Sequence, residues 1–195
     1  MSSPTLTAHS TSLICADTDL RGPIAIGPNV IIHPRATIYA AAGPILLGER
    51  CIVEEGCIIE EGHNEDRREQ PLYGWLSAGI ESPSIGDNNT FQPRSTASAG
   101  VIVTDNCIIS AGTILLPSPT HTDERPETLP PYTVIYGAES SRQTWDGSGQ
   151  VAEMALRSKH AEFLREIIPK YVLDDILLVD GNVNRYRFNR LRPTT

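Results

Sequence analysis

Apolar residues recur at every sixth position through most of this chain. The residues in this register are Ile14, Leu20, Ile26, Ile32 and Ile38, then Leu47, Val53 and Ile59, then Ile85, Phe91, Ala97, Val103, Ile109 and Leu115. A fixed short period is the signature of repeat architectures, in which each hexapeptide makes one short strand and one corner. The period therefore predicts a solenoid before any other property of the chain is considered.

A second position, four residues after the first, is mostly small. Its occupants are Val30, Ala36, Ala42, Cys51, Cys57, Ser95, Val101, Cys107 and Thr113. The residue before it is often asparagine or glycine, which tolerate the backbone angles of a tight corner, although Arg35, Arg50 and Arg94 also occur there. Three hexapeptides close one triangular coil, and coils stack as parallel strands about 4.8 Å apart. We expect an all-β solenoid, a left-handed parallel β-helix of about five coils.

Three interruptions of the count mark segments that leave the coils. Three extra residues bulge at a corner between Ile38 and Leu47, and longer loops are expected near residues 60–84 and 116–132. We expect the β-helix to occupy residues 1–137 and a linker to occupy 138–147. Expelled loops are where the chemistry of such a fold is to be sought.

The period changes to that of an α-helix over residues 148–171. Apolar or aromatic side chains recur at Leu156, His160, Phe163, Leu164, Ile167 and Ile168, with charged residues between them. The pattern predicts an amphipathic helix that packs along one side of the prism, and a helix offered to a partner is the alternative. The tail, residues 172–195, is apolar and then basic, which leaves open whether it docks or is mobile.

Charge and cysteine placement narrow the range of ligands. The net charge of −8 argues against nucleic acid or an anionic membrane as a partner. The first ten residues lack a basic segment followed by an apolar one, so we expect a cytoplasmic protein. Cys51, Cys57 and Cys107 occupy the small inward position, and no two cysteines are spaced as in a metal knuckle. We expect no metal and no cofactor.

The histidines decide whether an enzyme is expected. Acyltransferases of this fold use a histidine as general base, and carbonic anhydrases of this fold bind zinc through three histidines. The five here are His9, His33, His63, His121 and His160, and no two are spaced as a zinc pair. His33 follows a core isoleucine and should be an exposed surface residue. His63 or His121 could serve only as a lone base, so no catalytic residue is assigned.

The central loop carries the candidate partner-binding residues. After a charged first half come Leu72, Tyr73, Trp75 and Leu76. Tyrosine and tryptophan on a loop either fold back on the prism or contact a partner, and the sequence favours neither reading. We keep these four residues as the candidate interaction site.

Four stretches give the chain a family resemblance. They are LRGPIAIGPNVIIHPRATIYAAAGPILLGERCIVEEGCIIEEG from Leu20, IGDNNTFQPRS from Ile85, YTVIYGAES from Tyr132 and AEFLREIIPKY from Ala161. Together they resemble the dynactin subunit 6 family, with the combination of TVIYGA and FLREIIPKY as the most discriminating feature. The resemblance extends over roughly Ile14 to Tyr171.

The resemblance implies a non-catalytic scaffold in the dynactin pointed-end complex, which supports dynein-dependent transport and cargo attachment along microtubules. It implies three partners: dynactin subunit 5 as the other half of a heterodimer, the pointed-end actin-related protein, and dynactin subunit 4. It also implies kinship with γ-type carbonic anhydrases. Where those enzymes carry Arg-Gly-Asp, this chain reads Arg21, Gly22 and Pro23.

The alternative reading is a homotrimeric hexapeptide-repeat enzyme, either an acyltransferase or a γ-type carbonic anhydrase. In such a trimer, loops from neighbouring chains would complete the active site. That reading predicts a trimer of the isolated chain and loss of activity on replacing His63 or His121.

Overall fold

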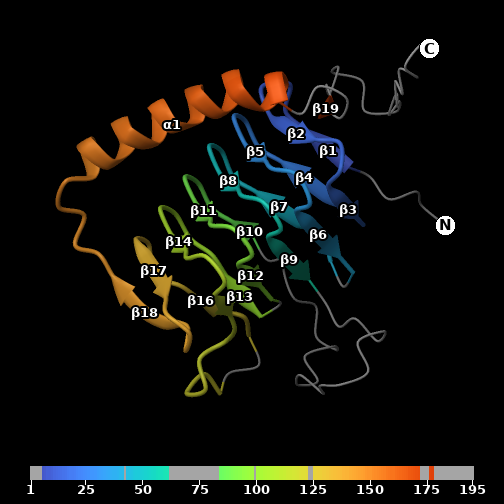
Figure 1. The fold of residues 1–195 in the computed structure, drawn as a ribbon. Helices are drawn as coiled ribbons and strands as arrows, with labels where there is room; N and C mark the ends of the chain where they lie inside the picture. Colours follow the sequence, from blue (N-terminus) through green and yellow to red (C-terminus); the bar gives the residue numbers. More distant parts are fainter. Residues whose placement is uncertain are drawn as a thin grey trace, which may run out of the picture.

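A computed structural model describes residues 6–41, 43–61, 84–98, 100–122, 125–171 and 176–177. Short strands follow one another with a corner after each, and each stacks on the strand three positions earlier in the chain (Figure 1). The first fifteen strands are β1 Leu6–Ala8, β2 Leu13–Cys15, β3 Asp19–Arg21, β4 Ile24–Ile26, β5 Ile31–Ile32, β6 Thr37–Ala40, β7 Ile45–Leu47, β8 Ile52–Val53, β9 Ile58–Glu61, β10 Ser84–Ile85, β11 Thr90–Phe91, β12 Thr96–Ala97, β13 Val101–Ile102, β14 Ile108–Ile109 and β15 Ile114–Leu115.

These strands make the three sides of a triangular prism. One side has the order β1-β4-β7-β10, continued to β13 by a bridge between Ile85 and Val103. The second side contains β2-β5-β8-β11-β14, and the third contains β3-β6-β9-β12-β15. All of these pairings are parallel, and three strands make one coil, so β1 to β15 form five coils. The predicted left-handed parallel β-helix is confirmed.

The interior is built from the two positions that the repeat marked. Every described residue in those positions is buried except Leu20, which is half-buried, and Ala42 lies outside the described residues. Phe91 fills the middle of the prism between Val53 and Ile109, its partners in the strands on either side. The narrow interior therefore follows from one aliphatic and one small residue per hexapeptide.

The corners have the backbone conformation that the sequence predicted. At the position before the small residue, φ is positive in Asn29, Arg35, Arg50, Asn88, Arg94 and Asn106, each between 55° and 59°, and in Gly56, Gly100 and Gly112. A single left-handed residue costs an ordinary side chain roughly 1–2 kcal/mol, and the regular corner hydrogen bonds offset that cost. Arginine is therefore accepted at these corners.

Asn89 occupies the small position of its coil although it is polar. Its side chain is fully buried, and its amide nitrogen donates to the carbonyls of Gly86 and Thr104, at 2.9 and 2.7 Å. Its amide oxygen accepts from the Cys107 backbone N–H at 2.7 Å. The side chain thus links two coils by pairing with their backbone groups, as a buried polar side chain requires.

Two segments expected to lack structure contain short strands. The expected linker 138–147 contains β18, Ser141–Thr144, which pairs antiparallel with β17, Thr133–Tyr136. The expected loop 116–132 contains β16, Glu127–Thr128, which pairs with β13. Both strands are polar, so their sequences carry no hydrophobic alternation, and they form because a neighbouring strand offers unpaired backbone groups. In the tail, β19, Ile176–Leu177, pairs antiparallel with β2.

The helix α1, Gln150–Tyr171, lies along the second side of the prism, as expected, but only part of its expected apolar stripe packs there (Figure 1). Leu164 and Ile168 are buried in a second cluster that includes Cys15, Ile31 and Ile52. Two members of the expected stripe face solvent instead, because Leu156 is 71% and Phe163 55% exposed. His160 is exposed as well. The predicted stripe is therefore wrong in part, and α1 packs through a face that also carries arginine and glutamate.

Candidate interaction surfaces

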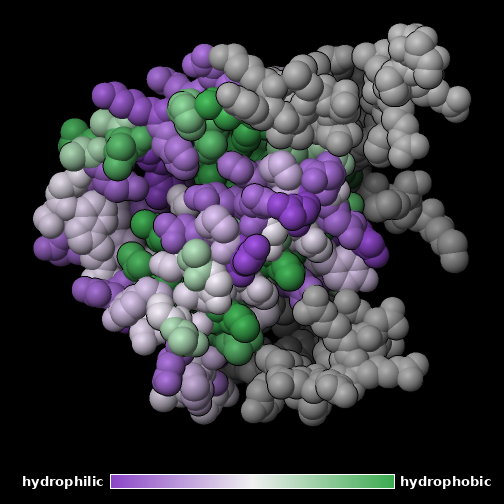
Figure 2. All heavy atoms as spheres, in the orientation of Figure 1, coloured by the Kyte–Doolittle hydropathy of each residue, from purple (hydrophilic) through white to green (hydrophobic). Residues whose placement is uncertain are grey.

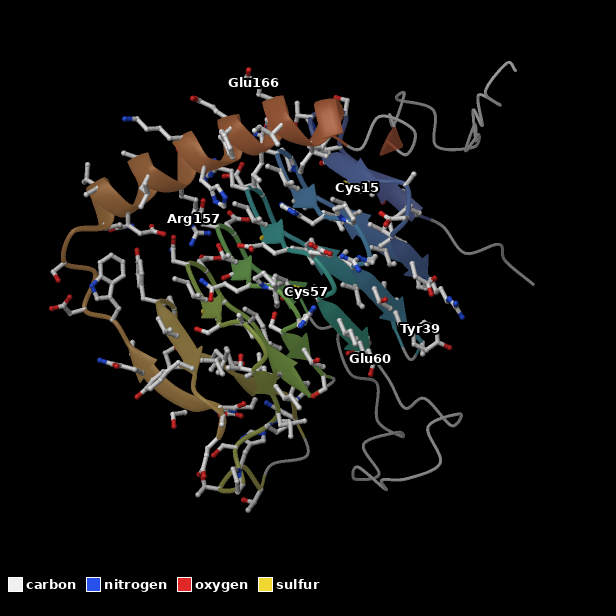
Figure 3. The ribbon with its side chains drawn as sticks, viewed as in Figure 1. Cys15, Tyr39, Cys57, Glu60, Arg157 and Glu166 are labelled. Carbon is white, nitrogen blue, oxygen red and sulfur yellow. The ribbon has the colours of Figure 1, made fainter. Side chains whose placement is uncertain are left out.

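Three polar side chains attach α1 to one edge of the prism. Arg165 donates to the Thr11 carbonyl at 2.7 Å, Arg157 donates to the Asn88 carbonyl, and Gln150 donates to the Tyr132 hydroxyl at 2.6 Å. Arg157 points from α1 toward the prism, whereas Glu166 points away from it (Figure 3). The sequence pattern placed these arginines only outside the apolar stripe, and it did not identify their contacts with the prism.

The spacing of these attachments has a geometric reason. A helix rises about 1.5 Å per residue, so steps of seven or eight residues cover about 11–12 Å. Two coils of the prism cover about 9.6 Å, which is close to that step. Asn29, Asn88 and Tyr132 lie on this edge at every second coil. Arg165 lies 3.5 Å from the Asn29 Oδ1 as well as contacting Thr11, one coil before Asn29. A side chain on α1 can therefore reach this edge at every second coil.

Beneath α1 lie two titratable side chains from neighbouring coils. His33 follows Ile32 of β5, and Glu54 follows Val53 of β8, the residue paired with Ile32. The charge of His160 in α1 affects the pKa of both side chains. Burial, with a smaller effect of His160, lowers the pKa of His33, and its Nε2 finds no partner among the described residues. Burial raises the pKa of Glu54, which His160 partly offsets. The predicted exposed surface position of His33 is wrong, because the residue is half-buried.

An ion pair closes the carboxyl-terminal end of the prism. Arg142 of β18 donates to a Glu127 carboxylate oxygen of β16 and to the Leu116 carbonyl that follows β15, so it joins all three sides. The other Glu127 oxygen accepts from the Ser118 N–H at 2.7 Å. Burial raises the pKa of Glu127, but the hydrogen bonds from Arg142 and Ser118 outweigh it and leave the pKa below its ordinary value. No sequence pattern identified this cap.

We expect Arg142→Met to lower the free energy of unfolding by about 2 kcal/mol at pH 7, because a half-buried Glu127 carboxylate loses its cation. A carboxyl with a lowered pKa contributes stability above its unfolded value, 4.5, and loses it as pH falls further. The difference between the variant and the original chain should therefore shrink below that pH. Urea unfolding of the two proteins at a series of pH values measures the loss of stability at pH 7 and its decrease at lower pH.

The matched control is Arg21→Met, since Arg21 forms an ion pair with Asp19 in which both side chains are largely exposed. Its effect should be much smaller than that of Arg142→Met, because an exposed ion pair contributes little to stability. Equal losses for the two arginine variants at pH 7 would contradict a stabilising role of the cap.

Exposed apolar side chains gather in two places. Four lie on α1 and are Val151, Met154, Leu156 and Phe163, and Figure 2 shows hydrophobic atoms over the first turns of that helix. Three others lie near the carboxyl-terminal end of the prism and are Ile114, Leu116 and Tyr136. Leu46 is exposed on a side of the prism. These are the apolar surfaces that the described part of the chain offers to a partner.

The candidate site residues of the central loop, Leu72, Tyr73, Trp75 and Leu76, lie outside the described residues. His63 also lies outside them. His121 lies in the proline-rich loop, where its Nε2 is 2.7 Å from the Arg125 carbonyl oxygen. Within the described ranges, no three His, Cys, Asp or Glu side chains are grouped as metal ligands.

The cysteines are unsuited to nucleophilic or metal chemistry. All four are buried and free of disulfides. Burial, and to a smaller extent Asp17, raises the pKa of Cys15 to about 12. Burial is also the main cause that raises the pKa of Cys51 to about 12. A thiolate is the reactive form, so neither group reacts or binds a metal readily near neutral pH. Cys15 packs in the same buried cluster as Leu164 and Ile168 of α1.

The Arg21-Gly22-Pro23 segment has a structural role. The Arg21 guanidinium pairs with Asp19 at 2.7 Å. Gly22 has φ of 89°, and a Cβ there would lie 2.1 Å from the Ala40 carbonyl oxygen. The Pro23 carbonyl accepts from the Ile45 N–H at 3.0 Å. These residues form a corner between stacked coils.

No helix among the described elements has the length and apolar character needed to cross a membrane. A small interior cavity of about 20 Å³ lies between Ile59 and Val103, among other core residues. That volume is about that of one water molecule, whereas an open groove of about 340 Å³ lies over Val134, Tyr136, Gln143 and Trp145.

Comparison with known proteins identifies relatives that match about four fifths of the chain. No protein-family model matches it. Dynactin subunit 6 of Xenopus tropicalis is 28% identical over 172 residues, which cover 82% of this chain and 79% of that protein. Dynactin subunit 6 of Danio rerio is 29% identical over 173 residues, covering 82% of each chain. A solved hexapeptide transferase family protein from Anaplasma phagocytophilum is 12% identical, covers 84% of this chain and 93% of its own, and has a TM-score of 0.47. The sequence matches confirm the resemblance that the repeat and helix motifs indicated, and the chain is a hexapeptide-repeat protein related to dynactin subunit 6.

Proposed function

We propose that this chain is a non-catalytic scaffold subunit of the dynactin pointed-end complex and supports dynein-dependent transport and cargo attachment along microtubules. The observation that carries the proposal is the similarity over four fifths of the chain to proteins named dynactin subunit 6 in several animals. The buried cysteines support a scaffold, since burial raises the pKa of each thiol and the thiolate is the reactive form.

The proposed partners are dynactin subunit 5, the pointed-end actin-related protein and dynactin subunit 4. A β-helix presents rigid sides of regularly spaced side chains, and such sides suit lateral packing against other subunits. The test is native purification of the tagged full chain from its own cells, with identification of the co-purifying proteins and determination of bound zinc. Recovery of dynactin subunits without stoichiometric zinc supports the scaffold. A homotrimer that carries zinc would replace it with the enzyme reading.

We expect the double substitution Tyr73→Ala with Trp75→Ala to reduce the recovery of dynactin subunit 5 by about tenfold, because aromatic anchors contribute a large share of interface energy. The control is Arg67→Ala with Arg68→Ala in the charged half of the same loop, which should leave recovery unchanged. The proposal for Leu72, Tyr73, Trp75 and Leu76 fails if the aromatic variant recovers as much subunit 5 as the control.

A further inference from the structure

The outer edge of β18 presents unpaired backbone groups. The Trp145 N–H donates to the Tyr132 carbonyl at 2.9 Å, and Val134 lies opposite Gln143 in the antiparallel register. Backbone groups of alternate residues face the same neighbour in such a pair. The N–H and C=O groups of Gln143 therefore face β17, and those of Arg142 and Thr144 face away from it.

β18 is the last strand on its side of the prism (Figure 1). Within the ranges that the structure describes, no backbone group pairs with the outward N–H and C=O groups of Arg142 and Thr144. At the opposite end of the same sheet, β19 covers the edge of β2. An edge with two outward-facing residues in an extended strand is a template for one more strand.

The side chains beside this edge favour one kind of strand. Val134, Tyr136, Gln143 and Trp145 line an open groove on the outer face of β17 and β18. Tyr136 is 44% exposed, and Trp145 contacts Tyr132 edge-on with ring centroids 5.6 Å apart. An apolar side chain of an added strand would lie beside Trp145 and extend this groove. On the inner face, Arg142 is already held by Glu127.

Charge argues against a second copy of this chain as the added strand. Glu139 precedes β18 and Asp146 follows it, and both are exposed. A two-fold antiparallel pairing centred on Gln143 would bring these two acidic residues near the same two of the second copy. Each copy also carries a net charge of −8. A strand with basic residues near its ends would instead complement Glu139 and Asp146.

We propose that the free edge of β18 binds an extended segment of another subunit of the complex as an added β-strand. This segment carries an apolar residue beside Trp145 and basic residues near Glu139 and Asp146. The inference rests on the proposed function, because the segment comes from a subunit of the same assembly. It names a second contact, separate from the central loop.

The test compares Thr144→Pro with Thr144→Val in the tagged full chain, purified natively from its own cells. Proline removes the outward N–H of Thr144 and is tolerated at an edge whose N–H does not pair within the sheet. Valine keeps that N–H and has nearly the same shape. We expect the proline variant to recover other dynactin subunits about tenfold less well, the valine variant to recover them as the original chain does, and both to unfold near the original temperature.

Amide hydrogen exchange provides the second measurement, made on the original chain alone and in the purified complex. The N–H groups of Arg142 and Thr144 should exchange slowly only in the complex, whereas that of Gln143 is slow in both. Undiminished recovery by the proline variant with unchanged exchange would overturn the inference, as would equal losses for both variants. If the original chain recovers no dynactin subunit, the proposed function fails and this inference falls with it.

Discussion

Phe91→Ala is expected to lower the free energy of unfolding by about 4 kcal/mol. Phe91 is fully buried, and its neighbours across the stacked strands are Val53 and Ile109. Its removal leaves a large cavity in a prism whose parallel strands are held in register by backbone hydrogen bonds, so the walls cannot close around it. Urea unfolding of the two proteins at pH 7 measures the difference.

Thr90→Ala is the matched control, because Thr90 is the outward residue of the same two-residue strand. Its substitution should cost less than about 1 kcal/mol. A loss below about 1.5 kcal/mol for Phe91→Ala would show that the interior relaxes around the cavity, contrary to the packing described here.

The contrast between these two neighbours shows why the interior could be predicted from the sequence. A hexapeptide places the same two positions inward in every coil, so a count of residues suffices to assign them. The corners follow the same count, and even Arg35 and Arg94 have the left-handed φ that their position requires. Asn89 escaped the prediction, because its amide replaces a small apolar residue and pairs with three backbone groups.

The face of α1 could not be predicted in this way. A helical pattern reports which residues are apolar, and it favoured a stripe through Leu156 and Phe163. The packed face is instead determined by distances along the prism, because Arg157 and Arg165 reach backbone carbonyls at its edge. That match depends on the coil spacing as well as on the helix, so no pattern within α1 alone contains it.

The candidate surfaces could not be predicted from the sequence either. Arg142 closes the end of the prism by meeting Glu127 from another strand, and these residues are 15 positions apart in a polar stretch without periodicity. β18 itself has the sequence SRQT, which predicts no strand. The Arg142–Glu127 ion pair and strand β18 each form against a neighbouring strand that is distant in the sequence pattern. They can therefore be identified from the structure but not from the sequence.

Gly22→Ala is expected to lower the free energy of unfolding by about 3 kcal/mol, as measured by urea unfolding. Two costs add. The backbone at Gly22 has φ of 89°, which L side chains rarely adopt, and the new Cβ would lie 2.1 Å from the Ala40 carbonyl oxygen. Ala40 belongs to β6, the strand stacked directly on β3, so relief of the clash would separate two coils.

Gly43→Ala is the control, since a Cβ at Gly43 has no atom within 4 Å. It should change the free energy of unfolding by less than about 0.5 kcal/mol. Equal effects of the two substitutions would contradict the close approach of the coils at Gly22. The expected contrast also accounts for the Arg-Gly-Pro segment, because the glycine is required by coil stacking alone. Its retention is therefore compatible with a scaffold, and the presence of this glycine does not argue for an enzyme.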